Sequence, residues 1–310
     1  MMPKSIGFLW VAVLAALSTG ASPVAAGNDV LRFGVLPVVD TLPLLVGESE
    51  GLFAAEAIDL QMVSFQSALE RDAALQAKKL DGYFGDLLNT ILLIRGGHPL
   101  KIITTAYHTH PDHRMFGIAA GPGSGVRSIR DLAHHHVAIS RATIIEYLLD
   151  RMAEREGLPV GSVAKQEIKK IPIRLQMLLA DQVPAALLPE PLLTLSESKG
   201  ARVIGDDRHL DTAETVLAME MTGKTNGLVT RFLTAYGKAV ARINARPDAY
   251  QDLLVEKTRF PMPVKDRYRV PEFPAVGSPS EADVAAVQDW LVASGMMTDR
   301  LRYGEIVYTP

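Results

Sequence analysis

Hydrophobic positions follow two periods along the first third of the chain. Residues 30–38 form a nearly continuous apolar run, residues 58–65 alternate apolar and polar side chains, and residues 82–86 and 101–107 are short apolar runs. Such runs predict β-strands, and the segments between them have the spacing of amphipathic helices. The resulting order β-α-β-α-β-α-β is typical of a mostly parallel sheet that is covered by helices on both faces.

A second unit of the same kind follows. Strands are predicted at residues 115–120, 136–140, 163–171, 185–189 and 201–205, with helices between them. The chain then becomes strongly helical, at residues 225–244, 247–257 and 280–294. The pattern therefore predicts an α/β protein with two units and a helical C-terminal part.

Composition narrows the possible functions. A length of 310 residues suggests two lobes or one large domain, and a formal charge of −3 argues against nucleic acid as the main partner. The absence of cysteine excludes disulfides, thiolate metal sites and cysteine nucleophiles. We find no P-loop, no G-x-S-x-G, no G-x-G-x-x-G and no H-E-x-x-H, so no catalytic residue and no cofactor is predicted.

The N-terminus predicts an exported protein. Lys4 is the only charge in residues 1–26, an apolar run extends over residues 6–17, and small residues precede Ala26. This is the layout of a secretory signal peptide, and a run of this length is short for a membrane span. No cysteine follows for a lipid anchor. We therefore expect cleavage after Ala26 and a periplasmic location for residues 27–310.

Four stretches carry a resemblance to a known family: residues 34–93, 122–151, 171–204 and 280–295. In these stretches the chain resembles the periplasmic substrate-binding component of an ABC importer. It is most similar to the NMT1-like branch, which handles nitrate, sulfonates and thiamine-pyrimidine precursors. The resemblance implies a type II periplasmic-binding-protein fold: two mostly parallel-sheet α/β lobes joined by a hinge, with a cleft between them.

The same resemblance implies a domain organisation and partners. Lobe 1 would be discontinuous, comprising residues 27–114 and 209–310, and lobe 2 would comprise residues 115–208. Hinge closure would bury a small-molecule ligand, and the closed protein would deliver that ligand to an ABC permease in the inner membrane. We expect a monomer.

The loops that follow the predicted strands supply candidate ligand-binding residues. In parallel α/β sheets, ligands bind beyond the carboxyl ends of the strands, close to helix N-termini. This rule selects residues in both lobes: Pro37, Asp40, Thr41, Asp86, Asn89, Tyr107, His108, Ser140, Arg141, Thr143, Glu146 and Glu190. Several of them have a simpler interpretation as helix caps, Asp40, Ser140 and Thr143 among them, and Glu146 as the partner of Thr143 in a capping box.

The charges of these candidates favour one class of ligand. Asp40, Asp86, Glu146 and Glu190 are acidic, and Arg141 is the only cation among them. An anion site would instead be rich in Arg, Ser and Thr at helix N-termini. We therefore expect a small polar organic ligand with an amine, an amidine or several hydrogen-bond donors, such as an aminopyrimidine.

Alternatives remain at this point. The segment from His108 to His113 holds a plausible set of nitrogen and oxygen ligands for zinc, whereas His134, His135 and His136 suit a solvated turn. Enzymes that make menaquinone or thiamine precursors share the bilobed fold, and an exported ligand sensor would also fit. We expect Trp290, the only tryptophan after the signal peptide, to lie too far from the cleft to sense a ligand.

Overall fold

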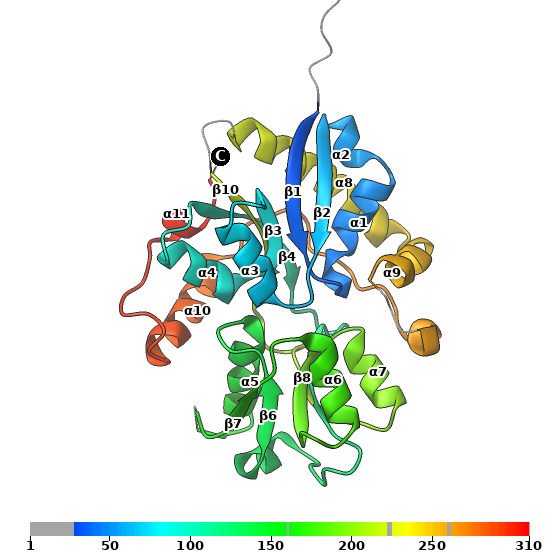
Figure 1. The fold of residues 1–310 in the computed structure, drawn as a ribbon, viewed down its shortest axis with the longest axis vertical. Helices are drawn as coiled ribbons and strands as arrows, with labels where there is room; N and C mark the ends of the chain where they lie inside the picture. The colour runs from blue at the N-terminus through cyan, green and yellow to red at the C-terminus, as the bar shows by residue number, and fades with distance from the viewer. Residues whose placement is uncertain (1–27, 160, 222–224, 259–261, 310) are drawn as a thin grey trace, which may run out of the picture.

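The computed structural model describes residues 28–159, 161–221, 225–258 and 262–309. The chain folds into two α/β lobes, one above the other in Figure 1, and each lobe is built on a five-stranded sheet. The predicted signal peptide lies outside the described residues. Within the described part of the chain, no helix has the length and the apolar composition needed to cross a membrane.

The first sheet collects strands from two distant parts of the chain. In spatial order they are β2 (Ile58–Ser64), β1 (Asp29–Val35), β3 (Gly82–Asp86), β10 (Ala213–Glu220) and β4 (Leu100–His108). β1 pairs in parallel with β2 over its whole length, Phe33 lying opposite Met62. Leu31 and Phe33 are buried in the core, so the alternation of this strand directs its apolar side chains inward.

The second sheet lies wholly within the middle of the chain. In spatial order its strands are β7 (Ala164–Glu167), β6 (His136–Ile139), β8 (Ala185–Pro189), β5 (Phe116–Ala120) and β9 (Arg202–Asp206). β6 pairs in parallel with both β7 and β8. All residues of β5 and β8 are buried, as expected for strands that are covered on both faces.

One strand in each sheet runs against the other four. β10 pairs antiparallel with β3 and β4, and β5 pairs antiparallel with β8 and β9. These are the strands by which the chain enters each lobe from the other one. The connecting segments are themselves joined, since Thr109 N donates to Thr212 O at 3.0 Å. The predicted fold, with two mostly parallel-sheet lobes, is confirmed.

Helices cover both sheets. Those around the first sheet are η1 (Val39–Thr41), α1 (Leu42–Ser49), α2 (Leu52–Ala55), α3 (Ala68–Gln76), α4 (Leu87–Arg95), α8 (Thr225–Ala245), η3 (Pro247–Tyr250), α9 (Gln251–Lys257), α10 (Glu281–Ala293) and α11 (Tyr303–Ile306). Those of the second lobe are η2 (Ile129–His134), α5 (Ile144–Arg155), α6 (Ile171–Leu179) and α7 (Leu192–Ser198). Phe232 of α8 packs on Phe33 and Phe53, with ring centroids 5.4 and 5.0 Å apart, so the C-terminal helices complete the first core.

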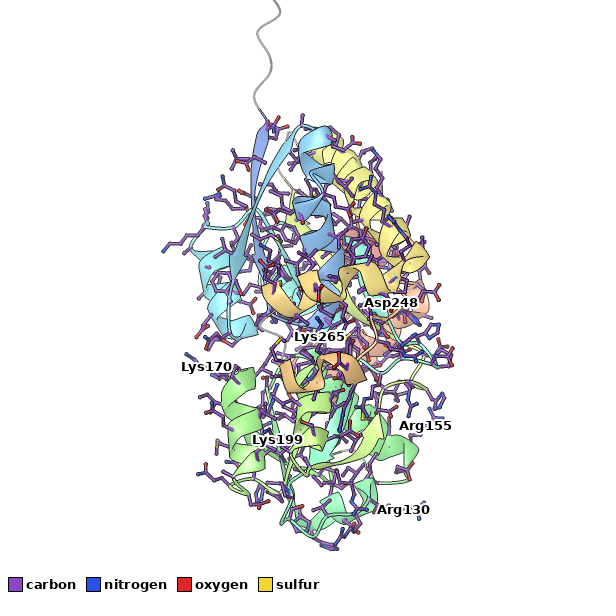
Figure 2. The ribbon with its side chains drawn as sticks, turned by 90° about the vertical axis from the view of Figure 1, so that its right-hand side faces the viewer. Arg130, Arg155, Lys170, Lys199, Asp248 and Lys265 are labelled. Carbon is purple, nitrogen blue, oxygen red and sulfur yellow. The ribbon has the colours of Figure 1, made fainter. Side chains whose placement is uncertain are left out.

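A short helix bridges the two lobes on one side. η4 (Met262–Arg267) contacts α9 of the first lobe and α7 of the second. Figure 2 shows it at the boundary between the lobes, marked by Lys265. The exact lobe boundaries at residues 114, 115, 208 and 209 stay a prediction.

Candidate functional site

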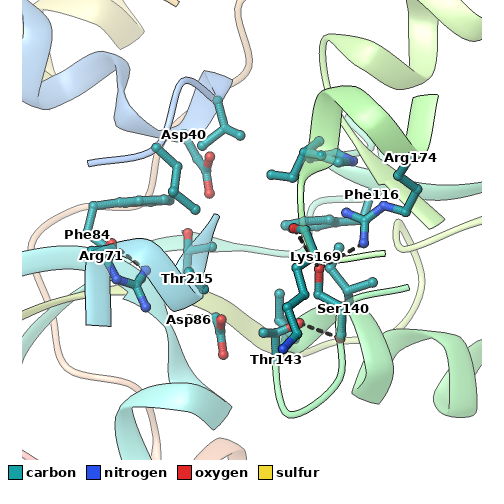
Figure 3. A pocket seen from close by; sticks show the side chains of 18 residues that line it. Asp40, Arg71, Phe84, Asp86, Phe116, Ser140, Thr143, Lys169, Arg174 and Thr215 are labelled. Carbon is teal, nitrogen blue, oxygen red and sulfur yellow. Dashed lines mark hydrogen bonds between the residues drawn. The ribbon is translucent and has the colours of Figure 1, made fainter. Parts of the chain in front are cut away.

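A cavity of about 60 Å³ lies between the two sheets. Its wall contains equal numbers of residues from the two lobes (Figure 3), and the polar ones are Asp40, Arg71, Asp86, Ser140, Thr143, Lys169, Arg174 and Thr215. Most of these follow the carboxyl ends of β1, β3, β6 and β7, where ligands of α/β sheets bind. The space holds no more than a few water molecules, so an organic solute would enter only when the lobes separate.

Arg71 forms the best-connected part of the first-lobe wall. Its guanidinium is fully buried and donates to Asp72 Oδ1 at 2.7 Å, to Asn89 Oδ1 at 2.7 Å and to the Phe84 carbonyl at 2.9 Å. The guanidinium also lies 4.3 Å from the centroid of the Tyr83 ring. Asn89 in turn donates to Asp72 Oδ2 at 3.0 Å. The charge of Arg71 is therefore balanced within the lobe.

Glycine is required beside this network. Gly85 lines the cavity on β3, and a Cβ atom there would lie 2.8 Å from Nη1 of Arg71. The same Cβ atom would lie 2.3 Å from Cε2 of Tyr83, so the Tyr83 ring and the guanidinium that lies over it would both have to shift. The close approach of Arg71 to the strand therefore depends on the missing Cβ.

Arg174, on the second-lobe wall, is buried like Arg71 but its charge is not paired. It lies on α6, is 0% exposed, and donates through Nη1 to Ser140 Oγ at 2.9 Å. Among the described residues, neither Nε nor Nη2 has a hydrogen-bond partner. Burial lowers the pKa of Arg174 to about 9. An unpaired buried charge is costly, so this guanidinium indicates a site for an additional partner.

Two carboxylates face the cavity from the first lobe. Asp40 lies on η1 and is 2% exposed, and burial raises its pKa to about 7. Its Oδ2 atom has no hydrogen-bond partner within the described part of the chain. Asp86 caps α4 by accepting from Asn89 N at 2.7 Å, and burial raises its pKa to about 6. Asp86 therefore combines a capping role with its predicted place on the cavity wall.

The structure places the predicted ligand-binding residues at several separate locations. Asp40, Asp86, Ser140 and Thr143 line the interlobe cavity. Asn89 and Arg141 line an adjoining cavity that shares Ser140 and Thr143, whereas Pro37 and Thr41 line a third cavity within the first lobe. Tyr107, His108, Glu146 and Glu190 do not line the interlobe cavity.

The four remote residues serve contacts within the fold. Glu190 accepts from Arg114 Nε at 2.8 Å and from Thr194. Glu146 accepts from Ala142 N at 2.8 Å and from Lys165 Nζ at 3.2 Å. Tyr107 donates to the His113 carbonyl, and His108 Nε2 lies 3.6 Å from Asp283, which raises the pKa of His108.

The charge of the cavity differs from the sequence prediction. Arg71, Lys169 and Arg174 line it beside Asp40 and Asp86, whereas Arg141 does not and Glu146 and Glu190 are paired elsewhere. The expectation of an acidic cleft with one cation is therefore wrong. The sequence did contain a signal for a buried cation in the cleft, because Arg174 is the only charged residue in the apolar helix Ile171–Leu179.

The histidine-rich loop between His108 and His113 was the candidate for a zinc site. The rings of His110 and His113 lie 5.4 Å apart, and His110 Nδ1 accepts from Asp112 N at 3.2 Å. No group of three or more His, Asp or Glu side chains among the described residues is placed to hold a metal ion. The structure therefore lends the zinc alternative no support.

Trp290 contacts the other lobe. Its indole N–H, on α10, donates to Asp150 Oδ2 on α5 at 3.1 Å, and its ring meets Tyr147 edge to face at 5.8 Å. Asp150 is also paired with Lys165 Nζ at 2.7 Å. Trp290 does not line the interlobe cavity, so the expectation that it lies away from the ligand stays a prediction, but its bond to Asp150 joins the two lobes.

Comparison with known families agrees with this geometry. The NMT1/THI5-like family matches residues 39–250, which is more than half of the chain. The chain belongs to this family. The predicted resemblance to the NMT1-like branch of periplasmic substrate-binding proteins is thereby confirmed. Among curated proteins, none matches the sequence of this chain.

Solved structures share the fold of this family member. The alkanesulfonate-binding protein SsuA from Xanthomonas axonopodis pv. citri, bound to MOPS, has a TM-score of 0.77 at 18% identity, covering 92% of this chain and 99% of that one. The ligand-binding component of an ABC-type import system from Staphylococcus aureus, with zinc bound, has a TM-score of 0.75 at 15% identity, covering 91% and 97%. The desulfurization enzyme DszB has a TM-score of 0.62 at 17% identity, covering 90% and 96%. At these identities the likeness establishes the fold alone.

Proposed function

We propose that this protein is an exported solute-binding protein, which captures a small polar solute between its lobes and presents it to an ABC permease. The cavity shared equally by the two lobes carries this proposal, since its walls hold unpartnered buried polar atoms, within the described residues, on both sides. A solute that contacts both walls favours the closed arrangement of the lobes. The predicted signal peptide supports a periplasmic location, and we propose a monomer.

Catalysis is the main alternative, because DszB has the same fold. The described residues that line the cavity include neither histidine nor cysteine, and the whole chain lacks cysteine. The cavity thus offers no general base of the histidine type and no thiolate nucleophile. These features favour binding over turnover. A sensor role would use the same cavity and the same closure.

Binding is expected to change the emission of Trp290. Residues 27–310 contain this single tryptophan, and it holds the lobes together at Asp150. A solute that keeps the lobes closed should hold the indole in its buried site and shift its emission to shorter wavelength. We would titrate a panel of small anionic, cationic, dipolar and neutral solutes, and follow emission together with the melting temperature.

The panel also discriminates between the functions. A Trp290→Phe variant is the control for the emission signal, because it lacks the tryptophan. Its melting temperature should still rise when the solute binds. Chemical conversion of the bound solute, followed by mass spectrometry, would identify an enzyme instead. A panel in which no solute raises the melting temperature would contradict the proposal.

Two carboxylates in opposite lobes provide a matched pair of variants. Asp86→Asn keeps a good helix cap but removes a charge from the cavity wall, so we expect about 10-fold weaker binding of the panel solute and an unchanged fold. Glu190→Gln breaks a buried pair with Arg114 outside the cavity, so it should lower stability and leave affinity within about 2-fold. Calorimetric titration and thermal melting measure both effects. The assignment fails if Glu190→Gln weakens binding more than Asp86→Asn does.

A further inference from the structure

The two walls of the interlobe cavity carry opposite charge. On the first-lobe wall, Asp40 and Asp86 face the space, whereas the charge of Arg71 is taken up by Asp72. On the second-lobe wall the charged residues are Lys169 and Arg174. Figure 3 shows the two groups on opposite sides of the space, with Asp40 and Arg174 facing each other across it.

The second-lobe wall lacks an anion. Among the described residues, Nε and Nη2 of Arg174 have no hydrogen-bond partner and no carboxylate forms an ion pair with the guanidinium, whose pKa is lowered by burial. The N-terminal turns of α5 and α6 end at the same wall, through Thr143, Ile144 and Ile171. Their backbone dipoles add positive potential there. A carboxylate or sulfonate group would supply the missing partner of the guanidinium.

The first-lobe wall has no cation paired with Asp40 among the described residues. Asp40 is almost fully buried, and its Oδ2 atom is without a partner in the described part of the chain. Its neighbours are the hydroxyl of Thr215 and a second buried carboxyl group, Glu214, whose pKa the charge of Asp40 helps to raise. Within the part of the chain that the structure describes, no cation balances the charge of Asp40, whereas Arg71 balances that of Asp72. An amino group would donate to Asp40 and balance its charge.

The space between the two unpartnered groups is apolar. Val38 and Phe84 line it from the first lobe, and Phe116 and Ile145 line it from the second. These side chains offer no hydrogen bonds to the middle of a ligand. They suit a short hydrocarbon segment that joins two polar ends.

We propose that the solute is a small dipolar molecule, with an anionic group bound by Arg174, an amino group bound by Asp40, and a short hydrocarbon segment between them. This inference rests on the proposed function. Such a molecule satisfies both walls at once, so its binding requires both lobes. A simple anion leaves Asp40 without a partner, and a simple amine leaves Arg174 without one.

Matched probes test the dipolar requirement. One set is 4-aminobutanoate, butanoate and 1-aminobutane, and the second replaces the carboxylate by 3-aminopropanesulfonate and propanesulfonate. Calorimetry on residues 27–310 should show that the dipolar member of at least one set binds 30-fold or more tightly than either single-ended member. The two sets distinguish a carboxylate ligand from a sulfonate ligand.

Variants assign the two ends. Arg174→Met should abolish the advantage of the dipolar probe over 1-aminobutane, and Asp40→Asn should abolish its advantage over the simple anion. Because Nε and Nη2 of Arg174 lack partners and its charge is unpaired in the described structure, Arg174→Met without solute should melt at or above the temperature of the unmodified protein. Arg174→Lys, which keeps the charge, should retain part of the advantage.

The outcomes separate this inference from the proposed function. If butanoate or propanesulfonate binds as tightly as its dipolar counterpart, the dipolar assignment is overturned, although solute capture between the lobes still stands. The same conclusion follows if Arg174→Met lowers the melting temperature strongly and leaves the affinities unchanged. If no solute of the wider panel binds at all, the proposed function fails as well.

Discussion

Replacing Arg71 by leucine is expected to lower the free energy of unfolding by about 3–5 kcal/mol, because the change leaves Asp72 as a buried carboxylate without its partner. Asn89 and the Phe84 carbonyl would lose donors in the same step. For a protein of this size the melting temperature should fall by about 10 °C. Urea unfolding, followed by circular dichroism, measures the loss directly.

Two further variants isolate the cause. Adding Asp72→Asn to Arg71→Leu removes the unpaired charge, so the double variant should regain part of the lost stability. Arg151→Leu, which breaks the exposed pair with Glu154, should cost less than about 1 kcal/mol. An Arg71→Leu protein as stable as the unmodified one would show that this buried network contributes nothing to the fold.

Stability without solute is expected to fall as the pH rises from 5 to 8. Burial raises the pKa of Asp40 and Asp207 to about 7 and that of Asp86 to about 6. Burial and the neighbouring Asp207 also raise the pKa of Glu214. The folded chain therefore holds more protons than the unfolded chain in this range, so deprotonation favours unfolding. Each unit of difference in pKa corresponds to about 1.4 kcal/mol.

Of the other groups, His113 acts in the opposite direction, because burial lowers its pKa and its contribution therefore rises with pH, but it is one group against four raised carboxyl groups. The raised pKa of His108 also makes stability fall as pH rises through it. Asp283 lies beside His108 and has a lowered pKa, so its contribution is lost only at acidic pH, below this range. The melting temperature should thus be higher at pH 5 than at pH 8, which differential scanning fluorimetry measures.

Glu214 provides the decisive variant. Its side chain is fully buried on β10, and neither carboxylate oxygen has a hydrogen-bond partner within the described residues. Glu214→Gln carries no charge at any pH, so it should raise the melting temperature at pH 8 by about 3 °C and leave the value at pH 5 nearly unchanged. Glu154→Gln, on an exposed side chain, serves as the control. If the melting temperature falls with pH equally in both variants, Glu214 is not the cause of the pH dependence.

Local pattern was sufficient for much of the architecture. The apolar run at residues 30–38 covers all of β1 except its first residue, the run at residues 58–65 contains β2, and Ser67 and Asp86 cap α3 and α4. Periodicity and caps depend on neighbouring residues, so the sequence displays them directly. The direction of β5 and β10 could not be predicted in this way, because it depends on the two crossings between the lobes.

The candidate site was predictable only in its location. Asp40, Asp86, Ser140 and Thr143 line the cavity because strand ends meet at one edge of a sheet. Glu190 also follows a strand, but it turns to Arg114, which lies just before the neighbouring strand β5 and 76 residues from Glu190 in sequence. The direction of a side chain at a strand end depends on partners that sequence distance conceals.

The sequence by itself determined the α/β order, the family resemblance and the edge of the sheets at which the cavity lies, because these follow from local periodicity and from the rule for strand ends. Only the tertiary structure decided which charges remain unpaired. Arg71 finds Asp72 and Asn89, whereas Arg174 and Asp40 face the same space from different lobes. Burial and pairing are properties of segments brought together from distant positions, so the ligand's chemistry can be inferred only after folding.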